Sequence, residues 1–221
     1  MINYKLFYGE KDKKPQHKWK NSEVFSNFYA EKRPLLIDGK LWLNTEQYFQ
    51  ANKFNHPNAT KYEKEYYNII HKADSSQKMK SIANQTKHRF GGKWMLNTGK
   101  TWIIGGSDQR LINDIIDKYK NKVKFRGDWW KIQSIYVRIR ALTHKFTQYK
   151  NLYRIIVNEI GDDDYLVENT SRDKIWADGG DGGSGKIGKN YLGKILTVLH
   201  HILKYGDCRK MSRELKEKVR V

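Results

Sequence analysis

The chain has 221 residues, enough for one large domain or two small ones, and at this length a hydrophobic core needs no disulfide or metal to stabilise it. Its single cysteine excludes an intramolecular disulfide and a cysteine-based zinc site. The formal net charge of +19, from 43 lysines and arginines against 24 aspartates and glutamates, favours anionic partners such as nucleic acid or phosphorylated metabolites. Because the lysines are dispersed, a compositional bias explains the charge equally well.

The sequence carries no segment typical of membrane insertion. The N-terminus lacks an apolar signal region, and no apolar run approaches the length of a membrane span. The lone cysteine suits a reducing compartment. We therefore expect a cytoplasmic protein without a membrane partner.

The first distinctive motif follows a polar N-terminal segment, residues 1–23. Asn27 lies between Phe25 and Phe28, in surroundings that remove water from its amide. A desolvated amide must pair with the backbone or with a ligand, because burying it unpaired costs a few kcal/mol. Asn27 is thus either a turn residue or a ligand-binding residue.

A β-hairpin and a helix come next. Residues 35–43 consist of two apolar runs around Asp38-Gly39, the usual sequence of a type I′ turn. The hairpin leads directly into a helix that is capped by Asn44 or Thr45. The hairpin should therefore fix where this helix begins.

The helix after the hairpin aligns three groups that are suited to chemistry. Glu46, Gln50 and Lys53 occur at i, i+4 and i+7, which places an acid, an amide and an amine on one face. Phe49 and Phe54 flank this face. The acid lies in the first turn, where the helix dipole favours its charged form. The alternative is an ordinary surface helix with charged residues at this spacing.

Apolar periodicity and capping residues predict further helices along the chain. Pro57 suits the first turn of the next one. Residues 91–106, with two tryptophans and two glycine pairs, are predicted to be an irregular or β-rich excursion rather than a domain. The predicted helices cover residues 58–73, 74–87, 107–119, 126–146 and 148–160, and a further, C-terminal helix begins at residue 190.

The longest of these helices carries a stripe that we predict to be buried. Its members are the regularly spaced apolar residues Ile132, Ile135, Ile139, Leu142 and Phe146. The basic residues of the helix fall outside this stripe: Arg138, Arg140, His144 and Lys145. Trp129 and Trp130 at its entrance are either core residues or a platform on which a base stacks.

The last third combines an acidic turn, a strand and a glycine-rich stretch. Residues 162–164 are three aspartates without EF-hand spacing, so a solvated turn is favoured over a metal site. Residues 165–169 alternate as a short strand, and residues 177–186 fit neither a Walker A loop nor a Rossmann fingerprint. Lys194, in the first turn of the following helix, opposes the helix dipole, so it is either fully solvated or compensated by a bound anion or a lowered pKa.

Four separated segments, taken in chain order, resemble the NADAR (YbiA-like) family. Any one of these motifs is weak, but their joint order is specific. The resemblance covers residues 24 to about 204, and Asp38-Gly39-Lys40 and Lys145-Phe146 also fit the family's pattern. The segments are residues 25–28 (FSNF), 46–54 (EQYFQANKF), 173–176 (DKIW) and 190–194 (NYLGK).

The resemblance implies a single α+β domain, mostly helical with small antiparallel sheets. It implies an N-glycosidase that breaks a ribosyl C1′–N bond without a cofactor or metal. The substrate would be a phosphoribosylaminopyrimidine intermediate of riboflavin synthesis, or ADP-ribosylated guanine in DNA or RNA. The acid, lysine and tryptophan positions of the family fall on Glu46, Lys53, Asp173, Trp176 and Lys194, and its polar positions fall on Asn27 and Asn190.

The chain departs from the family's pattern in three places. Ala177 stands where the pattern has a glycine, which could narrow that loop. The block 91–121 is longer than usual, and the usual L-x-T-G step before the last strand is not evident. These departures concern the identity of the substrate more than the type of bond that is broken. We place the domain at residues 24–205, followed by a frayed basic tail at 206–221; the oligomeric state stays open.

Cleavage of a C1′–N bond needs an acid for the leaving nitrogen and a base or nucleophile opposite. Glu46 and Asp173 are the predicted carboxylates, whereas Lys53 or Lys194 would instead attack an opened sugar and form a Schiff base. Substrate-binding roles are predicted for Phe25, Asn27, Gln50, Trp129 or Trp130, Trp176 and Asn190. The alternative function is a non-catalytic basic protein that binds nucleic acid through exposed aromatic and lysine side chains.

Overall fold

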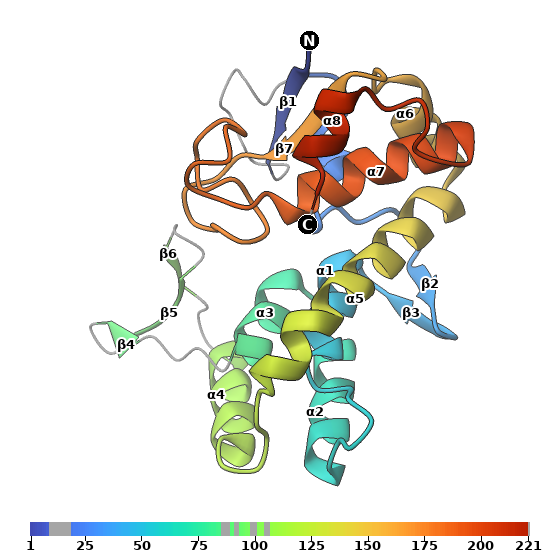
Figure 1. The fold of residues 1–221 in the computed structure, drawn as a ribbon. Helices are drawn as coiled ribbons and strands as arrows, with labels where there is room; N and C mark the ends of the chain where they lie inside the picture. Colours follow the sequence, from blue (N-terminus) through green and yellow to red (C-terminus); the bar gives the residue numbers. More distant parts are fainter. Residues whose placement is uncertain (9–18, 85–88, 91–92, 98–100, 104–106, 221) are drawn as a thin grey trace. The chain divides into compact units, whose positions relative to one another are not determined.

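The computed structural model describes residues 1–8, 19–84, 89–90, 93–97, 101–103 and 107–220 (Figure 1). The chain divides into two compact units. The terminal unit comprises Met1–Tyr29 and Leu142–Val221, and the central unit comprises Ala30–Ala141. Each unit is described by itself below.

The central unit is largely helical. Its two sheets are antiparallel: a hairpin of β2 and β3, and a three-stranded sheet in the order β4-β5-β6. Strands β5 and β6 of the latter lie within residues 91–106, which we predicted to be an irregular or β-rich excursion, and β4 precedes this block. Its elements are β2 (Leu35–Ile37), β3 (Lys40–Trp42), α1 (Thr45–Asn52), α2 (Lys61–His71), α3 (Ser76–Asn84), β4 (Arg89–Phe90), β5 (Lys93–Asn97), β6 (Thr101–Ile103), α4 (Ser107–Tyr119) and the first part of α5 (Gly127–Gln148).

The terminal unit is built from both ends of the chain. Its sheet consists of β1 and β7, which run parallel with Asn3 opposite Asp164 and Phe7 opposite Glu168. The predicted antiparallel pairing therefore holds for the hairpin and for β4–β6, whereas this sheet is parallel. Its elements are β1 (Asn3–Phe7), the 3-10 helix η2 (Ser22–Phe25), the end of α5, α6 (Lys150–Asn158), β7 (Asp164–Glu168), α7 (Tyr191–Tyr205) and α8 (Arg213–Lys218).

The hairpin and the start of α1 follow the prediction. Asp38 and Gly39 have φ angles of 52° and 71°, as a type I′ turn requires, and the cap of α1 is Asn44. The Asn44 side chain accepts a hydrogen bond from the backbone N–H of Gln47 at 3.0 Å. Trp42, at the end of β3, is fully buried. The hairpin thus fixes the first turn of α1, where Glu46 lies.

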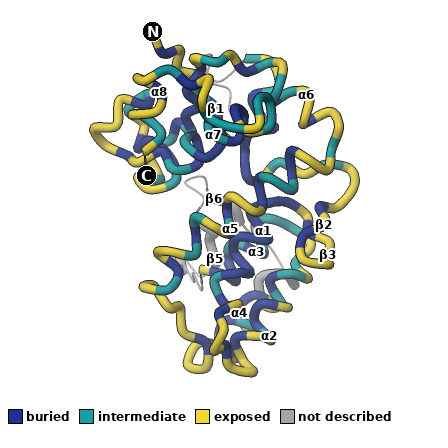
Figure 2. The backbone as a smooth tube through the Cα atoms, turned by 45° about the vertical axis from the view of Figure 1, so that its right-hand side comes forward, coloured by how far each residue is buried: buried dark blue, intermediate teal, exposed yellow. Residues whose placement is uncertain are grey.

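Every residue of α1 is buried although most of them are polar, so the surface-helix alternative is wrong (Figure 2). The polar side chains find partners inside the unit, and Gln47 is the clearest case. Its Nε2 donates to the carbonyls of Ile70, His71 and Ala73, and its Oε1 accepts from the N–H of Leu43. These bonds offset the cost of burying the amide and tie α1 to the end of α2.

The start of α2 differs from the prediction. The helix begins at Lys61, and Pro57 lies outside it. Thr60 accepts from the N–H of Glu63, and the Glu63 carboxylate accepts in turn from the N–H of Thr60 at 2.7 Å. This reciprocal capping box satisfies two free N–H groups of the helix, which a proline in its first turn would not do.

The predicted buried stripe of α5 is only partly correct. Leu142 and Phe146 are fully buried, but Ile132 and Ile139 are 62% and 42% exposed. Instead α5 buries two cations, Arg138 and Lys145, each 2% exposed. The Lys145 ammonium, for example, donates to the backbone carbonyl of Ser26 at 2.8 Å. A prediction from the spacing of apolar residues misses such cations, which are buried because a carboxylate, a carbonyl or an aromatic ring is their partner.

The helix α7 packs on β7 at very short range. A Cβ atom built on Gly193 would lie 2.0 Å from the carbonyl oxygen of Leu166, so only glycine fits. Thr197, one turn later, accepts from the N–H of Leu166 at 3.0 Å. Helix α7, which carries Lys194 and is preceded by Asn190, is therefore held in direct backbone contact with β7.

The C-terminal segment is not a frayed tail. Residues Arg213–Lys218 form α8, which is capped by Ser212. Leu215 is fully buried and packs with Met211, Ile2 and Val167. The apolar residues of this segment recur every four positions, a spacing that predicts a helix with one buried face. The many basic residues around them led us to predict a frayed tail instead.

The described residues bear out an α+β fold that is mostly helical with small sheets. Within the residues that the structure describes, we find no helix with the length and apolar character needed to cross a bilayer. The acidic turn is less solvated than predicted, because Asp164 is buried and pairs with Lys5 at 3.2 Å.

Candidate active site

Glu46 is the centre of a buried polar cluster in the central unit. Its side chain is 7% exposed. Its Oε1 accepts from the Nε2 of Gln50 at 2.7 Å, and its Oε2 accepts from the Nη2 of Arg138 at 3.1 Å. The i, i+4 spacing on α1 thus brings the acid and the amide together as predicted, and α5 adds a cation.

Arg138 is held from two sides. Its guanidinium carbon lies 3.7 Å from the centre of the Phe49 ring, in a cation–π stack. The Phe49 ring also packs against Trp130, whose ring centre is 4.9 Å away. An aromatic layer therefore fixes the plane of the guanidinium that binds Glu46.

Gln50 offers an acceptor to a ligand. A carboxylate only accepts hydrogen bonds, so the amide nitrogen of Gln50 must face Glu46. The Oε1 of Gln50 is then left buried, and it has no hydrogen-bond partner within the described part of the chain. A buried acceptor of this kind calls for a donor N–H or O–H from a substrate or a water.

Lys53 follows the last residue of α1 and has an unusual acidity. Burial lowers the pKa of its ammonium to about 8, assisted by the nearby charges of Lys80 and Arg138 and opposed by Glu46. Its Nζ donates to the Oδ1 of Asn84 at 2.9 Å. An amine that titrates near pH 8 can carry a proton at neutral pH and also release it.

The Glu46 carboxyl is kept ionised by its neighbours. Burial by itself would raise the pKa of Glu46, but the charges of Arg138, Lys80 and Lys53 and the hydrogen bond from Gln50 together hold it below the ordinary value. The cluster therefore combines a carboxylate, an ammonium of lowered pKa and a free acceptor.

The two tryptophans at the start of α5 differ in exposure. Trp130 is buried against Phe49, whereas Trp129 is half-buried and its ring centre lies 5.8 Å from that of His56. Trp129 therefore offers more free ring surface for stacking than Trp130 does. The predicted stacking role stays a prediction for both.

Asp173 and Trp176 lie in the terminal unit. The Oδ1 of Asp173 accepts from the N–H groups of Ile175 and Trp176, both at 2.8 Å, which forms an Asx-type turn. The Trp176 ring meets that of Tyr191 edge to face, with centres 6.0 Å apart. The turn thus places Trp176 next to the first residue of α7.

Other predicted residues of this unit have structural partners. Asn190 accepts from the N–H of Glu168 and donates to the carbonyl of Leu166, so it fastens the start of α7 to β7. Phe25 is fully buried with Phe146, at a ring separation of 5.6 Å, and Asn27 is 4% exposed. These contacts account for Phe25 and Asn190 without a ligand.

A pocket of about 360 Å³ lies between the glycine-rich loop and the start of α7. Its charged lining residues are three lysines, Lys189, Lys194 and Lys218, and one glutamate, Glu217. Burial and the charges of Lys218 and Lys189 lower the pKa of Lys194, whose Nζ donates to the backbone carbonyl of Arg220 at 2.5 Å. The pocket is suited to an anion, because a negative charge would relieve the repulsion among these ammonium groups.

The model of the NADAR domain matches residues 6–204, which span both units. The chain belongs to the NADAR domain family. It is 30% identical over 180 residues to the N-glycosidase YbiA of Shigella flexneri, covering 81% of this chain and 80% of that protein, and 30% identical over 179 residues to the one of Escherichia coli K12. The NMR structure of Escherichia coli YbiA is similar with a TM-score of 0.57 and 26% identity, covering 92% of this chain and 86% of that one.

The predicted family resemblance is thereby confirmed. The structure also shows two residues of this NADAR domain that the sequence analysis missed. Arg138 was placed outside the apolar stripe of its helix, and nothing local marks it as the partner of Glu46. Asp178 is fully buried and accepts from Asn169, Thr170, Gly180 and Gly183, so it organises the glycine-rich loop. The Asp-Gly-Gly repeat of residues 178–183 was the available signal.

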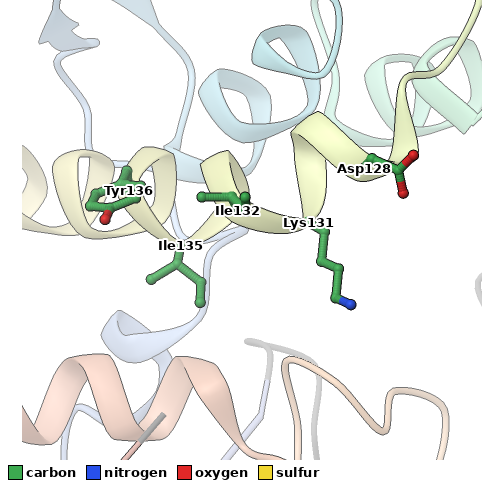
Figure 3. Close-up of a pocket in the computed structure, with 5 residues that line it drawn as sticks. All are labelled: Asp128, Lys131, Ile132, Ile135 and Tyr136. Atoms are coloured by element: carbon green, nitrogen blue, oxygen red, sulfur yellow. The ribbon is translucent and has the colours of Figure 1, made fainter.

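Among the described residues, those that line a second hollow in the NADAR domain all belong to α5 (Figure 3). None of its lining residues is a predicted site residue. Ile132 and Tyr136 are 62% and 64% exposed, which makes this a mostly apolar surface. The lining residues are Asp128, Lys131, Ile132, Ile135 and Tyr136.

Proposed function

We propose that this NADAR-domain protein is an N-glycosidase that hydrolyses a ribosyl C1′–N bond. The observation that carries the proposal is the buried cluster in which Glu46 is ionised by Arg138 and Gln50 beside the amine of Lys53. The name of the Shigella and Escherichia relatives supports the same chemistry.

The cluster has the parts that this reaction needs. Breaking a C1′–N bond builds positive charge on the sugar and negative charge on the leaving nitrogen. A carboxylate stabilises or supplies the attacking group, and an acid protonates the nitrogen. Asp173, in the terminal unit, remains our second predicted carboxylate.

We propose that the substrate carries phosphate. The lysines around the pocket of the terminal unit and the net charge of +19 support an anionic ligand. Two substrates fit this chemistry: a phosphoribosylaminopyrimidine intermediate of riboflavin synthesis, and ADP-ribosylated guanine in DNA or RNA.

The deciding experiment is to incubate the protein separately with each of these two substrates and to measure the release of free base or free ADP-ribose. We expect release from one of them. In Glu46→Gln, turnover should fall by about 10²–10⁴-fold, since the variant loses the carboxylate of an acid–base pair, while ligand affinity is retained. Glu214→Gln, which alters an exposed acid of α8, is the matched control and should keep full activity.

A Schiff base on Lys53 or Lys194 is the other route to the same products. Borohydride would trap a protein–sugar adduct on this route, and Lys53→Ala or Lys194→Ala would abolish it. Turnover without a trapped adduct would remove this route and leave the carboxylate mechanism.

The alternative function, a nucleic-acid-binding protein without activity, predicts a different result for Glu46→Gln. Such a protein should bind nucleic acid as well or slightly tighter after the loss of a negative charge, with strong salt dependence and no product. Failure to release product from either substrate, combined with this binding, would contradict the glycosidase proposal.

A further inference from the structure

Arg138 is the residue of the cluster whose role the family motifs do not specify. It comes from the middle of α5, 92 positions from Glu46 in the sequence, and is 2% exposed. Its guanidinium stacks on Phe49 at 3.7 Å and donates to the carboxylate of Glu46 at 3.1 Å. The stack on the ring and the hydrogen bond to the carboxylate together fix the orientation of this buried guanidinium.

We propose that Arg138 is a positioning residue that holds Glu46 as a fixed carboxylate, so that Glu46 serves as the base of the hydrolysis and Lys53 as the acid. The assignment of base and acid rests on the proposed function. The positioning of Glu46 by Arg138 rests on the contacts alone.

Electrostatics supports the first half of this assignment. A carboxyl that is 93% buried would be protonated without a cation beside it, because burial disfavours its charged form. The cations that act on Glu46 are Arg138 from α5, Lys80 from α3 and Lys53 at the end of α1, and Arg138 has the largest effect of the three. Ionised and held in this way, Glu46 begins the reaction as a carboxylate, which can accept a proton and has none of its own to give to the leaving nitrogen.

Geometry leaves the carboxylate free to act. A carboxylate has about four acceptor positions, and the bonds from Gln50 and Arg138 occupy two of them, one on each oxygen. A water molecule can therefore still donate to Glu46. The two existing bonds fix the rotamer of the side chain and the direction of its remaining lone pairs.

The proton balance follows from these two roles. The oxygen of a water molecule bonds to C1′ while one proton of that water passes to Glu46. The C1′–N bond breaks, its electron pair stays on nitrogen, and the nitrogen takes a proton from the Lys53 ammonium. Transfer of the proton from Glu46 back to the Lys53 amine, directly or through water, restores the site, and the net reaction consumes one water.

The test is the ionisation of Glu46 itself, followed by carboxyl carbon NMR in protein labelled at glutamate and assigned by the signal that disappears in Glu46→Gln. In the unaltered protein we expect Glu46 to titrate below the ordinary glutamate range. In Arg138→Met its midpoint should rise by roughly 1–3 pH units, the usual effect of removing an adjacent opposite charge. A midpoint at pH 6 or above in the unaltered protein would overturn the proposal without any arginine variant.

Arg140→Met is the matched control. It removes the same charge two positions along α5, from an exposed residue that pairs with Asp38, and should leave the midpoint of Glu46 unchanged. Should Arg138→Met fail to fold, Arg138→Lys is the second variant. It keeps the positive charge but loses the planar guanidinium that stacks on Phe49, and it should raise the midpoint of Glu46 by less than Arg138→Met would. Equal midpoints in the arginine and lysine proteins would show that Arg138 does not position Glu46.

The kinetic readout separates this proposal from the proposed function. For the substrate that is hydrolysed, the acid limb of the kcat/KM profile should move up in Arg138→Met by the same number of pH units as the NMR midpoint, with partial rescue in Arg138→Lys. An acid limb that stays in place would contradict the role of Glu46 as base. Because the NMR titration needs no substrate, absence of hydrolysis would count against the proposed function alone.

Discussion

At the scale of single residues, the site joins groups whose ionisation depends on one another. Glu46 and Lys53 lie on one helix face, and each is shifted by the charge of the other and by Arg138. The pKa of Lys53, about 8, makes it a proton donor below that pH and a free amine above it.

The residue-scale prediction concerns the fall of activity at alkaline pH. If Lys53 donates the proton, kcat/KM should fall as the pH rises through about 8, because the ammonium is lost there. Lys53→Met should abolish this fall together with most of the turnover. Measurement of kcat/KM between pH 6 and 10 decides the matter, with Lys61→Met, at an exposed lysine, as the control. An unchanged profile in Lys53→Met would assign the acid to another group.

The sequence predicted half of this cluster. Spacing alone places Glu46, Gln50 and Lys53 on one face, since these residues are one and two turns apart. It could not predict Arg138, because the pairing joins helices that are distant in the chain and because a buried cation looks like a surface residue in any hydropathy pattern. The burial that lowers the pKa of Lys53 is likewise a property of tertiary packing.

At the scale of elements, the predictions are confirmed where a turn or a helix cap depends on residues that are adjacent in the sequence. The Asp38-Gly39 turn and the Asn44 cap depend on neighbouring residues, and both are present. The beginning of α2 was misplaced because Thr60 and Glu63 form a better cap than Pro57 provides. The parallel pairing of β1 with β7 joins distant segments and could not be read from either one.

The element-scale prediction tests the contact of α7 with β7. In Gly193→Ala the added methyl would meet the Leu166 carbonyl, which is backbone and cannot move aside, so α7 must shift. We expect a loss in the free energy of unfolding of about 3 kcal/mol, at the upper end for overpacking, measured by urea denaturation.

Gly206→Ala is the comparison for this variant. Gly206 follows α7 with a φ of 81° and has open space around it, so alanine should cost only about 1 kcal/mol of backbone strain. A Gly193→Ala protein as stable as the Gly206→Ala protein would contradict the close packing of α7 on β7.

At the scale of the whole molecule, the two ends of the chain share one unit while the middle forms the other. The family model spans both, so the NADAR domain is built of two compact parts. The sequence gives no sign of this division, because the long helix α5 runs through the boundary at residue 142 without a linker.

The whole-molecule prediction concerns the C-terminal helix. Leu215 of α8 is fully buried with Ile2 and Val167, so Leu215→Ala should lower the stability by about 2–5 kcal/mol and the melting temperature by roughly 5–15 °C. Leu111→Ala, at a residue 54% exposed, should change it by less than about 0.5 kcal/mol. Calorimetry of the two variants measures these changes. A Leu215→Ala protein with the melting temperature of the unaltered protein would contradict the packing of α8 and support a frayed tail.

The pairing of β1 with β7 has a consequence for biosynthesis. As the chain leaves the ribosome, the central unit is complete once residue 141 has emerged, whereas β1 waits for a partner strand that is translated much later. Helix α8 is translated after β7, and the core around Leu215 closes only once α8 is made. The central unit should therefore acquire structure before the terminal unit, with β1 exposed to chaperones until β7 has been translated.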